Sequence, residues 1–265
     1  MTAKVYIPNK SALSSYVSAI WETIPRGVSN EMILPKGSVE LVFNLSDPMK
    51  GILPHQLNAI TTPDCFMQGL NTHVVNVQYS GDQHLFGINL ETHMVKSLLG
   101  IIPSECKNTL IDLTLINPFF KRVWHQLMDA NTFQERVAVI ENTFPILDQV
   151  NCPRTHYFCS IFSNSKIEAP ASVDILTKNI CYSSRQLNRK SQSLFGLTTE
   201  ELLIHKKFRT AVSLMHDDTK ALTSIAYEAG FYDQAHFCRV FKNYTGLTAK
   251  DYQLQKSELA FHIFS

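Results

Sequence analysis

The sequence predicts an α+β protein: a small antiparallel β barrel or sandwich with covering helices, followed by an all-α domain. Residues 1 to about 112 alternate short apolar runs with Gly, Pro and Asn turn signals, which is typical of an antiparallel barrel or sandwich. From about residue 118 onward, apolar residues recur at helical spacing instead. The chain has 265 residues, which is long enough for two domains with separate cores.

Three strands stand out in the N-terminal part. Residues 39–45 carry apolar side chains at every second position, and further strands are expected at 73–79 and 84–90. Glu40 and Asn44 point away from the apolar stripe of their strand. A solvated sheet face is the favoured interpretation of these two residues, and the lining of a pocket is the alternative.

Helices are expected around and beyond this domain. Helical spacing predicts one helix over 11–21 and another over 91–99. Residues 118–150 predict two helices broken near residue 130. This pair either supplies a dimer interface or packs against the barrel, and the sequence does not decide between them. Asn151-Cys-Pro153 is the best boundary before the C-terminal domain.

The stretch 220–246 contains two helical patterns joined by a glycine turn. Apolar residues of the first recur at i, i+3, i+4 and i+7, and Gly230 follows, where a helix ending in the left-handed conformation accepts glycine most easily. The second helix is expected to begin near Asp233, with Phe237 and Phe241 on its inner face. This is helix-turn-helix geometry, in which the second helix enters the DNA major groove. An ordinary helical hairpin with a solvated face is the alternative.

The outward face of this second helix carries the candidate base contacts. Arginine can bind guanine with two hydrogen bonds, and glutamine can do the same for adenine. The predicted DNA-binding residues of this helix are Gln234, Ala235, Cys238, Arg239 and Lys242.

The segment GFYDQAHFCRVFKNYTG, residues 230–246, resembles the second helix-turn-helix of the AraC/XylS family of transcription regulators. The resemblance implies a double-stranded DNA partner and a second, weaker copy of the motif upstream, joined by a long helix. It also makes RNA polymerase a candidate partner.

The upstream copy lies at 172–196. Ser183 to Gln186 is a capping-box signature, so its second helix is expected to begin at Ser184. Compared with the family pattern, Thr177 replaces an alanine, Cys181 a glycine and Ser191 a core aromatic residue. We expect this copy to be less stable than the downstream one. Its predicted DNA-binding residues are Arg185, Asn188, Arg189 and Gln192.

A helix of nineteen residues over 198–216 is expected to join the two copies. At 1.5 Å per residue it spans about 28 Å, close to the roughly 34 Å of one DNA turn. Such a helix places both recognition helices in successive major grooves. Lys206, Lys207 and Arg209 are expected to face solvent or phosphate.

The segment from Trp21 through ILPKGSVELVFNLSDP to FGINL resembles the N-terminal domain of one branch of AraC-type regulators. Members of that branch carry an aspartate where Lys36 stands, and often a basic residue where this chain has Asn89 or Leu90. The resemblance implies a sensor that binds an unknown small-molecule or protein effector, or that mediates homodimerisation.

Charge distribution agrees with this division. Residues 166–256 contain 13 Lys and Arg against 9 Asp and Glu, whereas the remainder contains 11 against 14. A basic C-terminal part behind a slightly acidic one fits a DNA-binding domain attached to something else.

Other classes of function receive less support. Six dispersed cysteines without a C-x-x-C pair argue against a zinc knuckle or a disulfide framework. His55, His73, His84 and His93 are too dispersed to favour a metal site. No Walker loop, G-x-G-x-x-G, G-x-S-x-G or H-E-x-x-H occurs, so we expect no cofactor and no enzymatic activity. A small barrel enzyme or ligand-binding domain with an appended DNA-binding module is the rival interpretation.

The expected organisation is therefore a β-rich sensor at 1–115, a helical linker at 116–150, an AraC-type DNA-binding domain at 151–256 and a tail at 257–265. No apolar run reaches the roughly 18 residues of a membrane span, and the first residues carry no apolar signal segment. We expect a cytoplasmic transcription regulator.

Overall fold

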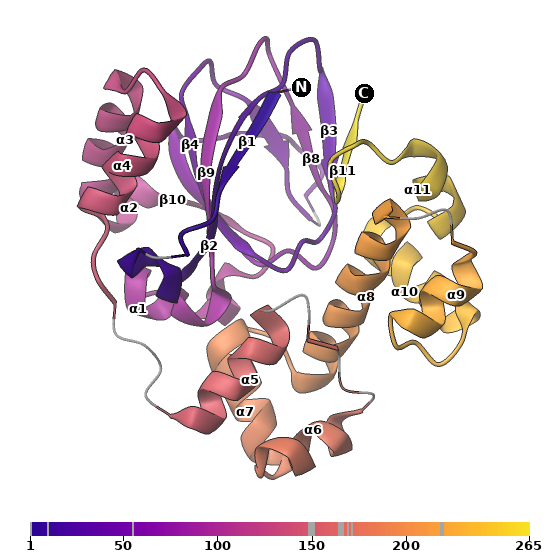
Figure 1. The fold of residues 1–265 in the computed structure, drawn as a ribbon. Helices are drawn as coiled ribbons and strands as arrows, with labels where there is room; N and C mark the ends of the chain where they lie inside the picture. The colour runs from indigo at the N-terminus through magenta and orange to yellow at the C-terminus, as the bar shows by residue number, and fades with distance from the viewer. Residues whose placement is uncertain are drawn as a thin grey trace.

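The computed structural model describes residues 2–9, 11–54, 56–147, 152–163, 167–168, 170, 172–217 and 220–265. Its N-terminal part is a sandwich of two antiparallel sheets, and its C-terminal part is helical (Figure 1). The predicted fold class is confirmed, with an open sandwich in place of a closed barrel.

Six strands form the first sheet, which has the order β1-β2-β9-β4-β7-β10. In that order they are Thr2–Tyr6, Val17–Ile24, Leu85–Leu90, Val39–Asn44, Cys65–Gln68 and Leu110–Asp112. The second sheet has the order β11-β3-β8-β5-β6. Its strands are His262–Phe264, Asn30–Ile33, Val75–Gln78, Lys50–Ile52 and Ile60–Thr61. The strands expected at 39–45, 73–79 and 84–90 are confirmed as β4, β8 and β9.

The central strand β4 is buried on both faces. Leu41 and Phe43 pack into the core beneath the covering helices, whereas Val42 belongs to the cluster between the two sheets. The expectation of a solvated face at Glu40 and Asn44 is therefore wrong, because the second sheet covers it and both residues are buried.

The helix expected over 11–21 is also wrong. A short 3-10 turn, η1 (Ala12–Ser15), is followed directly by strand β2. Val17 and Ile20 are both buried at a spacing of three because a bulge between Val17 and Ala19 shifts the register against β9. The bulge gave the strand an apparently helical spacing.

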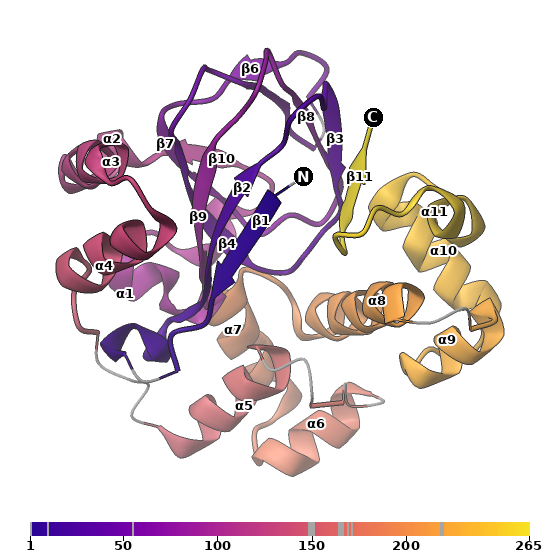
Figure 2. The same cartoon turned by 45° about the horizontal axis from the view of Figure 1, so that its top comes forward.

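Helices cover the outer face of the first sheet (Figure 2). They are η2 (Thr92–Met94), α1 (Val95–Leu99), η3 (Pro103–Cys106), α2 (Leu113–Ile116), α3 (Phe119–Asp129) and α4 (Phe133–Thr143). The helix expected over 91–99 is thus η2 with α1. Leu127 of α3 and Ile140 of α4 are fully buried in the same core as the sheet. Packing against the sandwich is therefore the observed role of the helix pair, and dimerisation stays a prediction.

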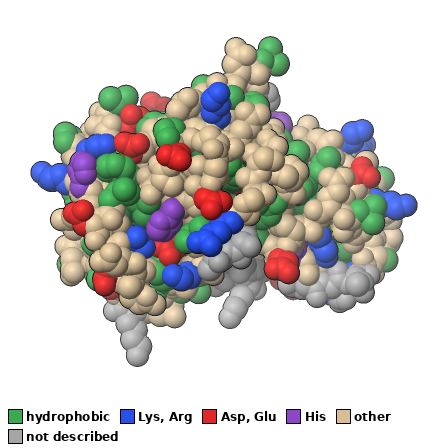
Figure 3. Space-filling view, turned by 90° about the horizontal axis from the view of Figure 1, so that it is seen from above, with side chains coloured by type: hydrophobic (Ala, Val, Ile, Leu, Met, Phe, Trp, Pro, Cys, Tyr) green, Lys and Arg blue, Asp and Glu red, His purple; other side chains and the backbone are tan. Residues whose placement is uncertain are grey.

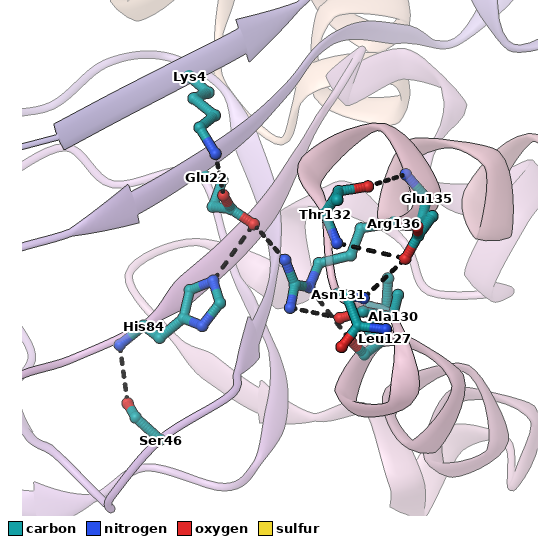
Figure 4. A network of polar contacts seen from close by, with 10 residues as sticks. All are labelled: Lys4, Glu22, Ser46, His84, Leu127, Ala130, Asn131, Thr132, Glu135 and Arg136. Carbon is teal, nitrogen blue, oxygen red and sulfur yellow. Dashed lines mark hydrogen bonds and ion pairs between the residues drawn. The ribbon is translucent and has the colours of Figure 1, made fainter.

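A buried ion pair fastens α4 to the sandwich (Figure 4). Arg136 donates from Nη1 to Glu22 Oε2 at 2.9 Å, and its other nitrogens donate to the carbonyl oxygens of Leu127 and Ala130. Lys4 and His84 lie 3.3 and 3.2 Å from the same carboxylate. Burial raises the pKa of Glu22, but these neighbours together bring that pKa below its usual value.

Seven helices follow in the described part of the C-terminal region. They are α5 (Pro153–Ser163), α6 (Val173–Ile180), α7 (Ser184–Phe195), α8 (Thr199–Asp217), α9 (Leu222–Glu228), α10 (Gln234–Thr245) and α11 (Ala249–Gln255). The chain then returns to the sandwich as β11 and pairs with β3 (Figure 1). The sequence had predicted only a tail for 257–265.

Candidate nucleic-acid interface

The first candidate recognition helix, α7, begins at the predicted residue. Ser183 caps it, with the Gln186 amide donating to Ser183 Oγ at 3.3 Å and the Gln186 side chain accepting from the Ser183 amide at 3.0 Å. Leu187 and Phe195 are buried on its inner face. This reciprocal cap fixes the start of the helix and hence which side chains face outward.

The outward face of α7 is available to a partner at three of its four predicted residues. Arg185, Arg189 and Gln192 are exposed. Asn188 is half-buried, and its Oδ1 accepts a hydrogen bond from the Thr199 amide at 3.1 Å. Asn188 therefore joins α7 to the start of α8 in this structure.

The second candidate recognition helix, α10, is capped by Asp233, which accepts a hydrogen bond from the His236 amide. Phe237 and Phe241 are fully buried, and Phe241 packs on Phe208 of α8 with ring centroids 5.6 Å apart. Helix α8 thus supports α10 directly from behind.

Most predicted contact residues of α10 face solvent. Ala235, Arg239 and Lys242 are exposed, and Cys238 is half-buried. Gln234 is exposed too, with its Oε1 accepting from Thr223 Oγ1 at 2.6 Å. The two arginines that could read bases, Arg189 and Arg239, therefore lie on accessible faces of two separate helices.

The two motifs differ at their turns and cores. Cys181 adopts a left-handed conformation with φ +57°, the region that Gly230 occupies with φ +82°. Ser191, which replaces an expected aromatic residue, is fully buried, and its hydroxyl has no hydrogen-bond partner among the described residues. Both features destabilise the first motif relative to the second.

Helix α8 joins the motifs without interruption over nineteen residues. Its basic residues do not behave as expected, however. Lys206 and Lys207 are buried, and Arg209 is half-buried and donates to the Phe162 carbonyl at 3.2 Å. Burial and the charge of Arg209 lower the pKa of Lys206 to about 8. The expectation that these three face solvent or phosphate is wrong, because Lys206 and Arg209 lie beside residues of the sandwich and the Lys207 side chain lies beside the turn at Gly230.

Helix α8 approaches the sandwich closely at Gly37, in the turn before β4. A Cβ placed on Gly37 would lie 2.6 Å from His205 Cε1 and 2.7 Å from Arg209 Cδ. On its other side, the His205 ring packs edge-on against Tyr244 of α10 at 5.6 Å. One buried histidine therefore connects the sandwich turn to the second recognition helix.

A second contact between the two parts involves α7. The ring centroids of His93 in η2 and Phe195 at the end of α7 lie 6.2 Å apart. Burial lowers the pKa of His93 to about 4 and the pKa of His205 to about 3. Both histidines are therefore neutral near pH 7.

The sandwich contains a partly open cavity of about 270 Å³ between its two sheets. Most of the lining is apolar, including Val42, Phe66 and Val77, and Glu40 and Trp21 also line it. The volume lies just below the roughly 300–1,000 Å³ of typical ligand pockets. Sequence analysis offered a pocket at Glu40 only as an alternative, and the structure places that side chain in one.

Charge elsewhere on the surface is mixed. The face of the molecule seen from above shows basic and acidic side chains interspersed (Figure 3). Among the described residues, no three His, Cys, Asp or Glu side chains are grouped as a metal would require, and His55 lies outside the part that the structure describes. No described helix is both long and apolar enough to cross a membrane.

Comparison with known families agrees with the helical geometry. Residues 176–255, which include both recognition helices, match a family described as a helix-turn-helix domain. The chain carries the AraC-type DNA-binding domain. Residues 5–112 match a domain of unknown function, DUF6597. The sequence resemblance to the AraC/XylS family is thereby confirmed for the C-terminal domain.

Two curated relatives match over part of the chain. One is the HTH-type transcriptional regulator ArgR of Pseudomonas aeruginosa, 22% identical over 96 residues, which are 36% of this chain and 29% of that protein. The other is an uncharacterized HTH-type transcriptional regulator of Haemophilus influenzae, 32% identical over 62 residues, 23% of this chain and 21% of that protein. The chain thus spans less than a third of the length of these relatives.

Solved structures of similar arrangement include wild-type ToxT of Vibrio cholerae bound to an unsaturated fatty acid. It has a TM-score of 0.49 and 14% identity, covering 93% of this chain and 98% of that one. A transcriptional regulator of Chromobacterium violaceum with an AraC-type DNA-binding domain has a TM-score of 0.35 and 23% identity, covering 40% and 94%.

Proposed function

We propose that the protein is a sequence-specific, DNA-binding transcription regulator whose N-terminal sandwich senses an effector. The observation that carries this proposal is the pair of exposed faces around Arg189 and Arg239, joined by the unbroken helix α8 within an AraC-type domain. Helices α7 and α10 would enter successive major grooves on one side of the duplex.

The side chains on these faces divide by the contact that each can make. Arg189 and Arg239 are suited to guanine, and Gln192 and Gln234 to adenine. Lys242 lies near the end of α10, where an ammonium group suits a phosphate. Arg185 lies in the first turn of α7 and suits either contact. Base contacts set sequence preference, whereas the phosphate contacts add affinity that weakens with salt.

The cavity supports a small-molecule effector. It lies between the two sheets, is mostly apolar and carries a few polar groups, as ligand sites commonly do. An effector that binds one domain arrangement better than another would shift the population toward it and so change how the two motifs meet DNA. A protein effector, a homodimer partner and RNA polymerase remain predictions from the family resemblance.

The test is a binding comparison on DNA selected by the purified protein from a random-sequence pool. Arg189→Ala and Arg239→Ala should each weaken binding to selected DNA by about 1–3 kcal/mol and relax preference at individual base pairs. Lys242→Ala should weaken selected and random DNA alike and reduce the salt dependence. Lys96→Ala, an exposed change on α1 and outside both helix-turn-helix motifs, is the charge-matched control and should have no effect. Equal losses on selected and random DNA for both arginines would exclude base reading.

A further inference from the structure

The last strand of the chain connects the DNA-binding half to the sensor sheet. Strand β11 follows α11 and pairs antiparallel with β3, with His262 opposite Ile33 and Phe264 opposite Glu31. The pairing continues beyond the strand, because Leu34 donates to the Phe261 carbonyl at 2.8 Å. A segment that follows the second helix-turn-helix is therefore an edge strand of the sandwich.

This segment has one side on the cavity and the other on the second helix-turn-helix. Leu259, Ala260 and His262 line the cavity. Phe261 and Ile263 pack into the cluster that contains the buried residues of α8, α9 and α10. Residues 259–261 form a turn in which Phe261 has φ +69°, and only His262 and Ile263 point to opposite faces through the period of two along a strand. Residues 259–263 are therefore a wall of the cavity, and any displacement of this wall changes both the cavity and the packing of the second motif.

The wall is held by a buried polar cluster. His262 Nδ1 contacts Glu31, and the Tyr79 hydroxyl donates to the same carboxylate. Burial raises the pKa of Glu31. Its hydrogen bonds with His262 and Tyr79, together with the nearby charge of Lys36, nevertheless bring that pKa below its usual value. The carboxylate is therefore ionised and already partnered in the docked state.

The charges around the cavity define the kind of molecule that fits. Lys36 is paired with Glu40 at 3.1 Å and Lys4 with Glu22 at 3.3 Å, whereas burial lowers the pKa of His262, so the Glu31 carboxylate is held by hydrogen bonds to His262 and Tyr79. An anion would therefore find both lysines already paired, and a cation would find the Glu31 carboxylate already hydrogen-bonded, so either ligand would enter at a high desolvation cost. A neutral molecule that is mostly apolar meets no such penalty.

We propose that the cavity takes a small, neutral, largely apolar molecule and that β11 is the wall that this molecule holds in place. The inference rests on the proposed effector function and names its ligand class and its route of regulation. Since the ligand touches residues 259–262 only when β11 is docked, it binds the docked state more tightly and stabilises it. Occupancy then fixes the second helix-turn-helix against the sandwich, whereas the empty protein releases it more readily.

The experiment uses N-phenyl-1-naphthylamine, a neutral apolar fluorophore, as the probe. The chain has two tryptophans, and Trp21 lines the cavity, so a Trp124→Phe background leaves Trp21 as the reporter. Probe binding should quench Trp21 emission by energy transfer. In the same protein, hydrogen exchange of the amides at 259–265 should slow when the probe is added.

Ile263→Pro is the test variant. Asn30 and Ser265 exchange both backbone hydrogen bonds, so Ile263 and Met32 form the next hydrogen-bonded pair of the ladder, and proline removes that amide. If undocking leaves under a tenth of the molecules competent, probe affinity should fall at least about tenfold. Ile263→Val keeps the amide and is the matched control, with affinity unchanged. His262→Ala, which keeps every backbone donor, should show a smaller loss and covers the case in which the proline variant fails to fold.

The outcomes separate the two proposals. Equal probe affinity in Ile263→Pro, Ile263→Val and His262→Ala, with exchange at 259–265 unaffected by the probe, would overturn the role of β11 and leave effector sensing intact. A wild-type protein that binds selected DNA but not the probe would overturn the assigned ligand class. Loss of base preference upon mutation of the recognition arginines is independent of both results.

Discussion

Replacing Gly37 by alanine should separate helix α8 from the sandwich. Gly37 has φ +74°, and an added Cβ would lie 2.6 Å from a carbon of the fully buried His205 ring. Carbon atoms pack best at about 3.5–4.0 Å, so either the turn or the ring must move. The ring cannot move freely, because it also packs against Tyr244.

The expected cost has two parts. The left-handed backbone costs about 1–2 kcal/mol for a non-glycine residue, and the lower unfolded-state entropy of alanine offsets about 0.5–1 kcal/mol of that. Overpacking against His205 and Arg209 adds about 1–3 kcal/mol. Gly37→Ala should therefore destabilise the docked protein by about 1.5–4 kcal/mol, measured by urea unfolding and by faster hydrogen exchange along α8.

Gly100 offers a matched control. It has the same φ of +74°, but no other atom lies within 4 Å of an added Cβ. Gly100→Ala should therefore show only the backbone part, about 0.5–1 kcal/mol. In a His205→Ala background the Gly37→Ala penalty should become smaller, because the contact with the ring is gone and only the contact with the flexible Arg209 side chain remains. Equal losses for Gly37→Ala and Gly100→Ala would refute the contact between the turn and α8.

Three further changes test other parts of the structure. Cys181→Gly should stabilise the first motif by about 0.5–1 kcal/mol, seen as a higher Tm, because glycine adopts the left-handed turn without strain. In the folded protein the pKa values of His93 and His205 lie below 6.5, so as pH falls the unfolded chain binds protons first. The free energy of unfolding should therefore decrease as pH drops from 6.5 toward about 4. His93→Phe should make this pH dependence weaker in urea titrations. Arg136→Ala should lower the free energy of unfolding by about 3–5 kcal/mol, because it leaves Glu22 buried without its closest partner. Glu22→Gln in the same chain should recover part of this loss. A loss under about 1 kcal/mol would contradict the pairing.

Local signals predicted the helix-turn-helix motifs well. The cap at Ser183, the start of α10 at Asp233 and the turn at Gly230 each depend on residues within a few positions of one another. The buried face of α10 was predicted equally well, because Phe237 and Phe241 recur at helical spacing. Whether the predicted DNA contacts occur stays a prediction.

Errors arose where distant segments decide the environment. Lys206 and Lys207 lie on a helix whose own sequence suggested a solvated face, yet segments distant in the sequence bury them. Glu40 alternates with an apolar stripe, but a second sheet covers its face. The pairing of His262 with Ile33 joins residues 229 positions apart, as their numbers show. No local pattern contains that information.

The contacts between the sandwich and the second motif were not predicted from the sequence, and they are the ones that could transmit a signal between these two parts. Gly37 meets His205, His205 meets Tyr244 of α10, and Leu34 of the sandwich belongs to the same buried cluster as Phe237 and Phe241. The core of the second motif is thus completed by residues of the sandwich. A change in the sandwich that moves this turn must repack the second recognition helix, since close-packed cores shift between discrete arrangements and do not deform smoothly. The first motif meets the sandwich through other residues, so an effector could change the angle between the two recognition helices without moving both equally.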